Sequence, residues 1–359
     1  MTLASCINWV QATISHYALN SSYALVQYYG FAPTWAGDFV FGFLNKFDVT
    51  CPSASSRIDR MVLESRTQSE HNAVRNEEKL AIVTGANCGI GFETAKALGR
   101  AGFHVVMGCR NVKLGTEAVL RLERQTGLTG RFELVHLDLA SLESVDAFVK
   151  NVRARGTPVD VLVNNAGVMA CPAAKTRDAI ELQFGTNHVG HFALTMGLVD
   201  QLKQAKDGAR VVVVSSIAAF LQRSISYAQI EQARLYHRWQ NYGISKLANL
   251  LFAMALARHL EGSGVAVNAL HPGTIATGLH RHVSSSSLGL LVQNAVLDSA
   301  PTGALTSIYL ALSPEVQGVS GQLYARSLPR EMHPIGYDVQ AQDELWAYTK
   351  KLIADRRAQ

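Results

Sequence analysis

Several features that mark common classes of protein are missing from this chain of 359 residues. It contains no run of more than two Lys or Arg residues, and its net charge of +5 is small for its length. Nucleic-acid binding normally needs a basic patch or stripe, so we expect no nucleic-acid partner. The five cysteines are odd in number and include no Cys-x-x-Cys pair. This argues against a disulfide framework or a structural zinc site and favours a reducing, intracellular compartment.

The N-terminal region lacks charge and is instead rich in aromatic residues. Residues 1–37 contain no Asp, Glu, Lys or Arg, but they include Trp9 and Trp35. A secretory signal would start with positive charge, and a transmembrane helix would need about 20 mostly apolar residues without the polar interruptions found here. Aromatic rings at this density suit the interface between water and lipid. We therefore expect residues 1–49 to bind a membrane surface, such as that of the endoplasmic reticulum. The alternative is a cytoplasmic protein in which they pack on the domain or on a partner.

Composition divides the rest of the chain into three parts. Residues 50–78 combine Pro52, several serines and clustered charges, which is typical of a linker with one short helix. Residues 79–330 carry the strand and helix patterns described next and are expected to form one domain. Residues 331–359 are expected to follow as a C-terminal helical tail.

From Lys79 onward, short runs of β-branched residues alternate with longer helical patterns. The expected strands are Leu80–Thr84, His104–Gly108, Arg131–Leu137, Val159–Asn164, Arg210–Ser215, Val265–Leu270 and Gly321–Tyr324. The expected helices include Phe92–Arg100, Leu142–Arg153, Phe192–Gln204 and Tyr242–Leu260. This alternation predicts an α/β fold, a single Rossmann-type, doubly wound parallel sheet with helices on both faces. In such a sheet the ligand binds at the carboxyl ends of the strands.

The first expected strand runs into a glycine-rich turn, Thr84-Gly85-Ala86-Asn87-Cys88-Gly89-Ile90-Gly91. Glycines here allow a sharp turn, a close approach of the backbone to a pyrophosphate, and tight packing of the next helix. The N-terminus of that helix offers free amides and a positive dipole end to the anion. We therefore expect a nicotinamide dinucleotide to bind at Gly85, Asn87, Cys88, Gly89, Ile90 and Gly91.

Residues after the next three strands extend the same cofactor site. Arg110 follows the second strand, at the point where an acidic residue would bind the ribose 2′-hydroxyl of NAD(H). An arginine there can instead hold the 2′-phosphate of NADP(H). We therefore favour NADP(H), with NAD(H) as the alternative. Two further groups follow the third and fourth strands, beside the adenine and along the cofactor: Asp138 with Leu139, and Asn165, Ala166 and Gly167.

Tyr242 and Lys246 are four residues apart on an expected helix, so both side chains lie on one face. A free tyrosine, with a pKa of about 10, is a poor base at neutral pH, and the ammonium of Lys246 should lower that pKa. Tyr242 can then exchange a proton with an alcohol oxygen. Ser216, at the end of the fifth strand, can hydrogen-bond the same oxygen. Asn187 can hold a water or a backbone group that links Lys246 to solvent.

These motifs, in this order, resemble the short-chain dehydrogenase/reductase family across residues 79–325. The segments that carry the resemblance are Thr84–Gly91, Asn164–Gly167, Asn187, Ser215-Ser216, Tyr242–Lys246 and His271-Pro272-Gly273. The resemblance implies a catalytic set of Asn187, Ser216, Tyr242 and Lys246. It also implies that Tyr242, Lys246, Pro272, Gly273 and Thr274 line the cofactor. Cys88 stands where the family usually has Ser or Thr, which removes one hydroxyl contact to a phosphate.

Within the family, the chain is most similar to the retinol dehydrogenase branch, near the X-linked dehydrogenase/reductase and the WW-domain-containing oxidoreductase. Thr186–Phe192 and Pro314–Gly321 carry part of this similarity. The branch implies a lipophilic substrate, an alcohol or its aldehyde or ketone of the retinoid, steroid or polyprenoid class. The segment Thr274–Ser299 is apolar, and together with Ile217–Asn241 it should cover the nicotinamide and exclude water.

Two other interpretations remain beside the enzyme. One is a catalytically weak cofactor-binding scaffold or redox-responsive regulator, and the other is a peripheral membrane adaptor that acts through residues 1–50. The complete Asn, Ser, Tyr and Lys set favours the enzyme. The family allows a homodimer, in which the helices Phe192–Gln204 and Tyr242–Leu260 would pair between subunits. His188 and His191 are three residues apart, but no third ligand lies nearby in the sequence, so we expect no metal site.

Overall fold

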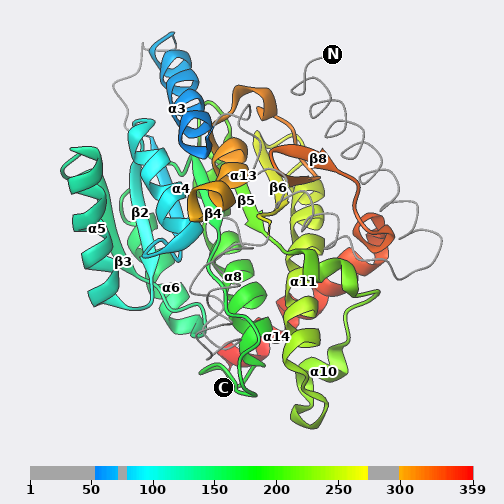
Figure 1. Cartoon of the computed structure of the whole chain (residues 1–359). Helices are drawn as coiled ribbons and strands as arrows, with labels where there is room; N and C mark the ends of the chain where they lie inside the picture. The colour runs from blue at the N-terminus through cyan, green and yellow to red at the C-terminus, as the bar shows by residue number, and fades with distance from the viewer. Residues whose placement is uncertain (1–52, 72–78, 274–298, 359) are drawn as a thin grey trace, which may run out of the picture.

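The computed structural model describes residues 53–71, 79–273 and 299–358. Within them, eight strands form one sheet in the order β3-β2-β1-β4-β5-β6-β7-β8 (Figure 1). The strands are β1 Leu80–Thr84, β2 His104–Cys109, β3 Phe132–His136, β4 Val161–Asn164, β5 Ala209–Val214, β6 Val265–His271, β7 Gln322–Ala325 and β8 Leu328–Arg330. β8 is antiparallel to β7, and every other neighbouring pair is parallel. The predicted Rossmann-type sheet is confirmed.

Helices cover both faces of the sheet (Figure 1). One hydrophobic cluster contains α3 Ala54–His71, α4 Gly89–Arg100, α5 Val112–Thr126 and α13 Ala300–Leu312. The other contains α6 Leu142–Arg153, α8 Gly190–Gly197, α11 Arg238–His259 and α14 Val339–Arg357. The shorter helical segments are α7 Leu182–Phe184, the π-helical turn η1 Gly185–Val189, α9 Val199–Lys203, η2 Ile217–Leu221, α10 Tyr227–Glu231, η3 Ala233–Leu235, η5 Pro314–Val316 and η6 Pro334–Tyr337. Successive residues of each strand point to opposite faces and therefore supply both clusters.

The order of the strands determines where a ligand can bind. The chain builds outward from β1 to β3 on one side and then continues from β4 on the other side of β1. The connections after β1 and after β4 therefore diverge, which opens a crevice at the carboxyl ends of these two strands. β1 and β4 pair in register from Ala81 opposite Val161 to Val83 opposite Val163. Both strands thus end at the same level, and the turns that follow them lie together.

Two local features differ from the expectation. The expected helix Phe192–Gln204 is wrong in its boundaries, because α8 ends at Gly197 and Leu198, with a φ of −108°, separates it from α9. The strand β8 was not expected. It has only three residues, and one of them is a proline, which is unusual in strands. The turn before it has Arg326 and Ser327 at positive φ (56° and 62°), where glycine is the usual signal of such a turn.

Within residues 50–78, where we expected a linker with one short helix, residues 54–71 form the 18-residue helix α3. Ile58, Met61 and Val62 lie on one side of it and are buried in the cluster formed with α4 and α13. Ser53 Oγ accepts a hydrogen bond from the amide of Ser56 at 3.2 Å, so a serine that suggested coil in fact caps a helix. The linker interpretation is therefore wrong for this segment.

The helix expected within residues 331–359 is present as α14, and it packs on the domain. Leu345 and Ile353 are buried against it. α11 is buried at every residue from Asn241 to Leu256, with β6 on one side and η2 and α14 on others. The expectation that α11 pairs between subunits is therefore wrong, because elements of the same chain cover it. The homodimer itself stays a prediction.

No helix among the described residues has the length and apolarity needed to cross a bilayer. The aromatic segment 1–49 lies outside the described residues, as does most of Thr274–Ser299. Membrane association of the first and the covering role of the second therefore stay predictions.

Replacing Ile58 with Ala tests whether α3 belongs to the domain. Ile58 is 5% exposed, so the cavity should lower the free energy of unfolding by about 2–4 kcal/mol, as measured by urea denaturation of the full chain. The control Leu63→Ala removes a side chain of the same helix that is 66% exposed, and it should change that free energy by less than about 0.5 kcal/mol. Equal effects of the two variants would mean that α3 does not pack on the domain.

Candidate active site

Turns at the carboxyl ends of the strands bring the predicted site residues to one edge of the sheet (Figure 1). The glycine-rich turn follows β1, Arg110 follows β2, and Asn165 begins the turn after β4. Ser216 follows β5, and Pro272-Gly273 follows β6. Segments from the whole length of the domain therefore meet at this edge. Thr274 lies outside the described residues.

The turn after β1 fits a phosphate. Gly85 and Gly89 have φ angles of 67° and 60°, which residues with a side chain rarely adopt. A Cβ on Gly91 would lie 2.5 Å from both Asn165 Nδ2 and Gly85 O, so only glycine lets α4 begin this close to the turn. The side chain of the N-cap residue Cys88 makes no capping hydrogen bond within the described chain. The first amides of α4 can therefore bind an anion, and the residues present fit the pyrophosphate of a dinucleotide.

Thr84, at the end of β1, holds the turn after β4 in place. Its Oγ1 accepts hydrogen bonds from the amides of Asn165 and Ala166, both at 2.9 Å, and Asn165 Nδ2 donates to Thr84 O at 2.8 Å. His191 Nδ1 donates to Asn187 O at 2.8 Å, so the Nε2 of the neutral ring is an acceptor. The Thr84 hydroxyl donates to that Nε2 at 2.9 Å. The Thr84 side chain thus joins the turn after β4 to His191, which in turn holds the segment that carries Asn187.

Tyr242, Ser216 and Lys246 lie together at this edge. The Ser216 hydroxyl lies close enough to the Tyr242 phenol to lower its pKa, and Lys246 Nζ is 6.0 Å from the centre of the Tyr242 ring. Lys246 Nζ donates to Val214 O at 3.0 Å, and Ser215 Oγ donates to Lys246 O at 2.7 Å. These two bonds fix α11 to the end of β5. The phenol and the Ser216 hydroxyl are thereby held side by side, where one substrate oxygen could meet both.

Asn187 lies in the π-helical turn η1, a feature often found at functional sites. Its Nδ2 donates to Val168 O at 2.9 Å and to Ser245 Oγ at 2.9 Å, while its Oδ1 accepts from Val168 N at 2.8 Å. Asn187 and Lys246 both lie close to Gly167, because a Cβ on this glycine would be 3.2 Å from Asn187 Oδ1 and 3.5 Å from Lys246 Nζ. Asn187 thus holds the backbone of Val168, while the link from Lys246 to solvent stays a prediction.

The pKa values of Tyr242 and Lys246 differ from the expectation. Burial raises the pKa of Tyr242 to about 12, and the nearby Ser216 hydroxyl offsets only part of this rise. Burial lowers the pKa of Lys246 to about 8. The expectation that Lys246 brings the tyrosine pKa below its ordinary value is therefore wrong for this structure. The physical reason is that desolvation of the phenolate outweighs the attraction of an amine that donates to Val214 O.

The residues after β2 and β3 occupy different environments. Arg110 is exposed and makes no ion pair or hydrogen bond with the described residues, so its guanidinium is available to a ligand. Asp138 Oδ1 accepts from the amide of Ala140 at 3.0 Å, which occupies part of its carboxylate. Leu139 is buried, and a Cβ on Gly190 would lie 2.4 Å from its carbonyl oxygen. Leu139 therefore packs under α8 more than it faces the crevice.

The two histidines serve the protein interior. His188 Nε2 and Thr349 Oγ1 are 2.9 Å apart, and His191 bonds Thr84 and Asn187 as described. Burial lowers the pKa of His188 to about 3 and that of His191 to about 4, so both rings are neutral at pH 7. Sequence reasoning missed Thr84 and His191 as residues that shape the site. The available signal was that His191 follows Asn187 by four residues, one helical turn.

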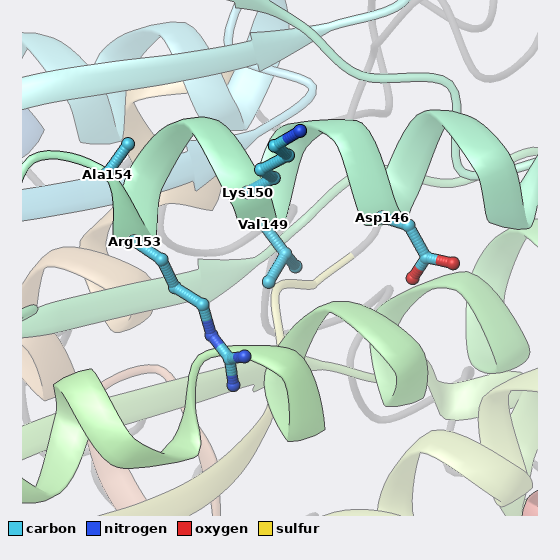
Figure 2. A pocket seen from close by; sticks show the side chains of 5 residues that line it. All are labelled: Asp146, Val149, Lys150, Arg153 and Ala154. Atoms are coloured by element: carbon cyan, nitrogen blue, oxygen red, sulfur yellow. The ribbon is translucent and has the colours of Figure 1, made fainter.

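A hollow on another part of the molecule has no relation to this site. Figure 2 shows it along α6, lined by Asp146, Val149, Lys150, Arg153 and Ala154. Two of its side chains form surface ion pairs, Arg153 with Asp200 and Asp146 with Arg357. None of the predicted cofactor or catalytic residues lines it, so the carboxyl edge of the sheet remains the candidate active site.

Comparison with known proteins gives matches along most of the chain. Residues 79–287 match the family model of the short chain dehydrogenases. Retinol dehydrogenase 14 of Homo sapiens is 41% identical over 291 residues, which cover 77% of this chain and 86% of that protein. Polyprenol dehydrogenase of Homo sapiens is 38% identical over 278 residues, which cover 75% of this chain and 83% of that protein.

Solved structures show the same similarity. An uncharacterized protein from Mycobacterium Paratuberculosis superimposes with a TM-score of 0.61 at 34% identity, covering 76% of this chain and 92% of that chain. L-Sorbose reductase from Gluconobacter frateurii, solved with NADPH and L-sorbose, superimposes with a TM-score of 0.56 at 25% identity, covering 69% of this chain and 94% of that chain. The helices α3 and α14 lie outside the residues matched by the family model.

Replacing Lys246 with Met should change how stability depends on pH. Between pH 8 and pH 10.5, the approximate pKa of the buried lysine and its ordinary value, the unfolded lysine is charged while the folded one is neutral. Unfolding then takes up a proton, so raising the pH through this window stabilises the wild-type protein relative to Lys246→Met. Between about pH 7.5 and about pH 9.5, urea denaturation should show the unfolding free energy of the wild type rising by about 1–2 kcal/mol relative to that of Lys246→Met.

Lys203→Met provides the matched control, because Lys203 is exposed on α9. Its stability relative to the wild type should be the same at both pH values. A difference between wild type and Lys246→Met that is also independent of pH would mean that Lys246 keeps its charge when buried.

Proposed function

The chain belongs to the short-chain dehydrogenase family, and on this premise we propose that it is an NADP(H)-dependent oxidoreductase that interconverts a lipophilic alcohol and its aldehyde or ketone. One observation carries the proposal. The hydroxyl of Ser216 lies close enough to the buried phenol of Tyr242 to act on its pKa, and Lys246 lies one turn along the same helix, at the carboxyl edge of the sheet. Two hydroxyl groups held in this way can act on one substrate oxygen.

Ser216 and Tyr242 have different roles at the substrate oxygen: Ser216 donates a hydrogen bond to it, and Tyr242 exchanges a proton with it. Ser216 Oγ accepts from the amide of Ala218 at 3.3 Å, which leaves its proton for the substrate oxygen or for Tyr242. Burial keeps the Tyr242 phenol protonated, because its pKa is raised to about 12, and this is the state that donates a proton to a carbonyl oxygen during reduction. In the reverse direction the phenolate takes the proton of the alcohol. A bound nicotinamide cofactor supplies the hydride to the carbonyl carbon or accepts it from the alcohol carbon.

Lys246 supports the proton transfer through its charge. A positive Nζ at 6.0 Å from the centre of the Tyr242 ring favours the phenolate as it forms. The low pKa of about 8 means that this amine can also change its protonation near neutral pH. Asn187 contributes by holding the backbone of Val168, next to Gly167, which lies close to both Asn187 and Lys246.

The choice of NADP(H) rests on Arg110. Its exposed guanidinium follows β2 and has no partner among the described residues, and charge-assisted hydrogen bonds to a 2′-phosphate would give it one. No acidic residue immediately follows β2 to bind a free 2′-hydroxyl, since the sequence there is Cys109-Arg110-Asn111. The complex of L-sorbose reductase with NADPH supports the same choice.

The lipophilic substrate class rests on the surroundings of the phenol. Met169, Ala170 and Ala218 pack against Tyr242 and form a small apolar cluster with it. An apolar wall beside the reacting oxygen favours a substrate with little polarity next to its carbonyl group. Relatives named retinol dehydrogenase and polyprenol dehydrogenase support retinoid or polyprenoid alcohols over sugars.

Replacing Tyr242 with Phe removes the proton donor and keeps the ring. With NADPH and a panel of lipophilic aldehydes that includes all-trans-retinal, kcat/KM should fall by at least about a hundredfold. Binding of NADPH, followed by fluorescence titration, should be unchanged. The control Tyr309→Phe removes a hydroxyl that bonds Glu315 Oε2 at 2.8 Å, away from the site, and should keep full activity. Full activity of Tyr242→Phe would remove this residue from the chemistry. Cofactor binding without turnover of any aldehyde by the wild type would favour the scaffold.

Replacing Arg110 with Ala tests the choice of cofactor. The KM for NADPH should rise by about tenfold to a hundredfold, because hydrogen bonds to a charged phosphate are lost, while the KM for NADH should stay the same. Arg124→Ala, an exposed arginine further along α5, serves as the control for loss of one positive charge. A parallel rise for both cofactors, or for neither, would contradict the assignment of Arg110 to the 2′-phosphate.

A further inference from the structure

Two neighbouring residues of α14, Tyr348 and Thr349, reach different parts of the candidate active site. Figure 1 shows α14 (red) crossing behind α11. Thr349 belongs to the buried stripe of this helix, which comprises Gln342, Leu345, Thr349 and Ile353. Tyr348 precedes it and is therefore turned by about 100° around the helix axis. The two side chains diverge, one toward the turn η1 and the other toward α10.

Thr349 contacts the turn that carries Asn187. Its Oγ1 is 2.9 Å from His188 Nε2, and both residues are fully buried. The His188 ring lies among three phenylalanine rings, with centroid distances of 5.0 to 6.1 Å. In such apolar surroundings a single hydrogen bond has a strong effect on the orientation of the ring, because no solvent can replace it. His188 adjoins Asn187 within η1, so this bond bears on the position of Asn187.

Tyr348 contacts the segment that joins Ser216 to Tyr242. Its hydroxyl donates to Glu231 Oε1 at 3.2 Å, and its ring centroid is 4.3 Å from that of Tyr227. Both partners belong to α10. Beyond them, Gln229 O accepts from Asn241 Nδ2 at 3.3 Å, and Asn241 immediately precedes Tyr242. This branch therefore ends at the residue that precedes Tyr242.

The attachment of α14 does not depend on either hydroxyl group. The Trp346 ring lies 4.8 Å from that of Phe192 and 4.3 Å from that of His259. Arg258 Nε donates to Gln342 Oε1 at 2.9 Å. Leu345 and Ile353 complete the buried contact. Removing one hydroxyl group from residue 348 or 349 should therefore leave the helix in place and disturb only the element that the hydroxyl group holds.

We propose that Tyr348 and Thr349 are positioning residues of the active site. Thr349 fixes η1 through His188 and thereby sets Asn187 beside Lys246. Tyr348 fixes α10 and thereby sets the wall of the segment that connects Ser216 to Tyr242. One helix outside the residues matched by the family model thus controls proton transfer through one residue and substrate binding through the next. The kinetic part of this inference rests on the proposed oxidoreductase function, whereas the structural part does not.

Kinetics of the full chain with NADPH and the aldehyde that the wild type turns over best should separate the two residues. Thr349→Val should lower kcat by about tenfold with little change in KM, because it leaves His188 Nε2 without a partner in a buried place. Thr349→Ser, which restores the hydroxyl group, should recover the wild-type kcat. Tyr348→Phe should raise the KM for the aldehyde by about threefold to tenfold with little change in kcat, because the ring remains and only the bond to Glu231 is lost.

Hydrogen exchange of backbone amides, followed by mass spectrometry, tests the same assignment without turnover. Thr349→Val should speed exchange in residues 185–189 and leave residues 227–231 unchanged, and Tyr348→Phe should do the reverse. Matched controls are Thr116→Val, whose hydroxyl donates only to Val112 O on the exposed face of α5 in the described structure, and Tyr337→Phe, which is 57% exposed. Both controls should exchange like the wild type in the two segments.

The outcomes distinguish the proposals. Faster exchange in both segments for either variant, or in neither, overturns the positioning roles, and so does a Thr349→Ser enzyme as slow as Thr349→Val. If the wild type binds NADPH but reduces no aldehyde while the exchange pattern is as expected, the proposed function fails and the separate attachment of η1 and α10 to α14 stands.

Discussion

The candidate site depends first on the hydroxyl group of Thr84. It lies at the end of β1, where the order of the sheet opens the crevice, and it accepts two amide hydrogen bonds from the turn after β4 while donating to His191. All of its hydrogen-bonding capacity is used in a place without access to water. Because His191 in turn bonds the carbonyl of Asn187, the cofactor turn and the catalytic turn share one support. A valine here would have the same shape, but it would take a hydrogen-bond partner from the amide of Ala166 and from His191 Nε2.

Desolvation is the second constraint on the site. Tyr242 and Lys246 are almost entirely buried, and burial moves their pKa values in opposite directions, the phenol upward and the amine downward. Both groups are therefore biased toward their neutral forms. The neutral phenol can hand its proton to a carbonyl oxygen, and the protonated form of Lys246 then favours the phenolate that is left. The same burial keeps His188 and His191 neutral, so they serve as fixed hydrogen-bonding groups and not as charges.

The amino-acid sequence determined the α/β sheet and the residues at its carboxyl edge. Strands such as β4 are apolar in continuous runs, here Val161–Val163, which is what burial on both faces requires. The role of the glycines at 85, 89 and 91 could be predicted, because only glycine tolerates the φ angles or the close contacts of that turn. The pairing of Tyr242 and Lys246 on one helix face could be predicted, because four residues make about one helical turn. Each of these signals is local: it lies within one element, and its geometry follows from backbone stereochemistry.

The tertiary structure decided what depends on contacts between distant segments. The serines at the start of α3 look like coil in the sequence, yet the helix forms because Ile58, Met61 and Val62 pack against α4 and α13. α14 looks like a tail, yet it covers α11 and reaches His188 and Glu231 through neighbouring residues. The spacing of Tyr242 and Lys246 suggested a lowered tyrosine pKa, and the structure reversed the direction. The physical reason is common to these cases: spacing along the chain fixes which residues share a face, while burial and hydrogen-bond partners are fixed only when faces from different parts of the chain meet.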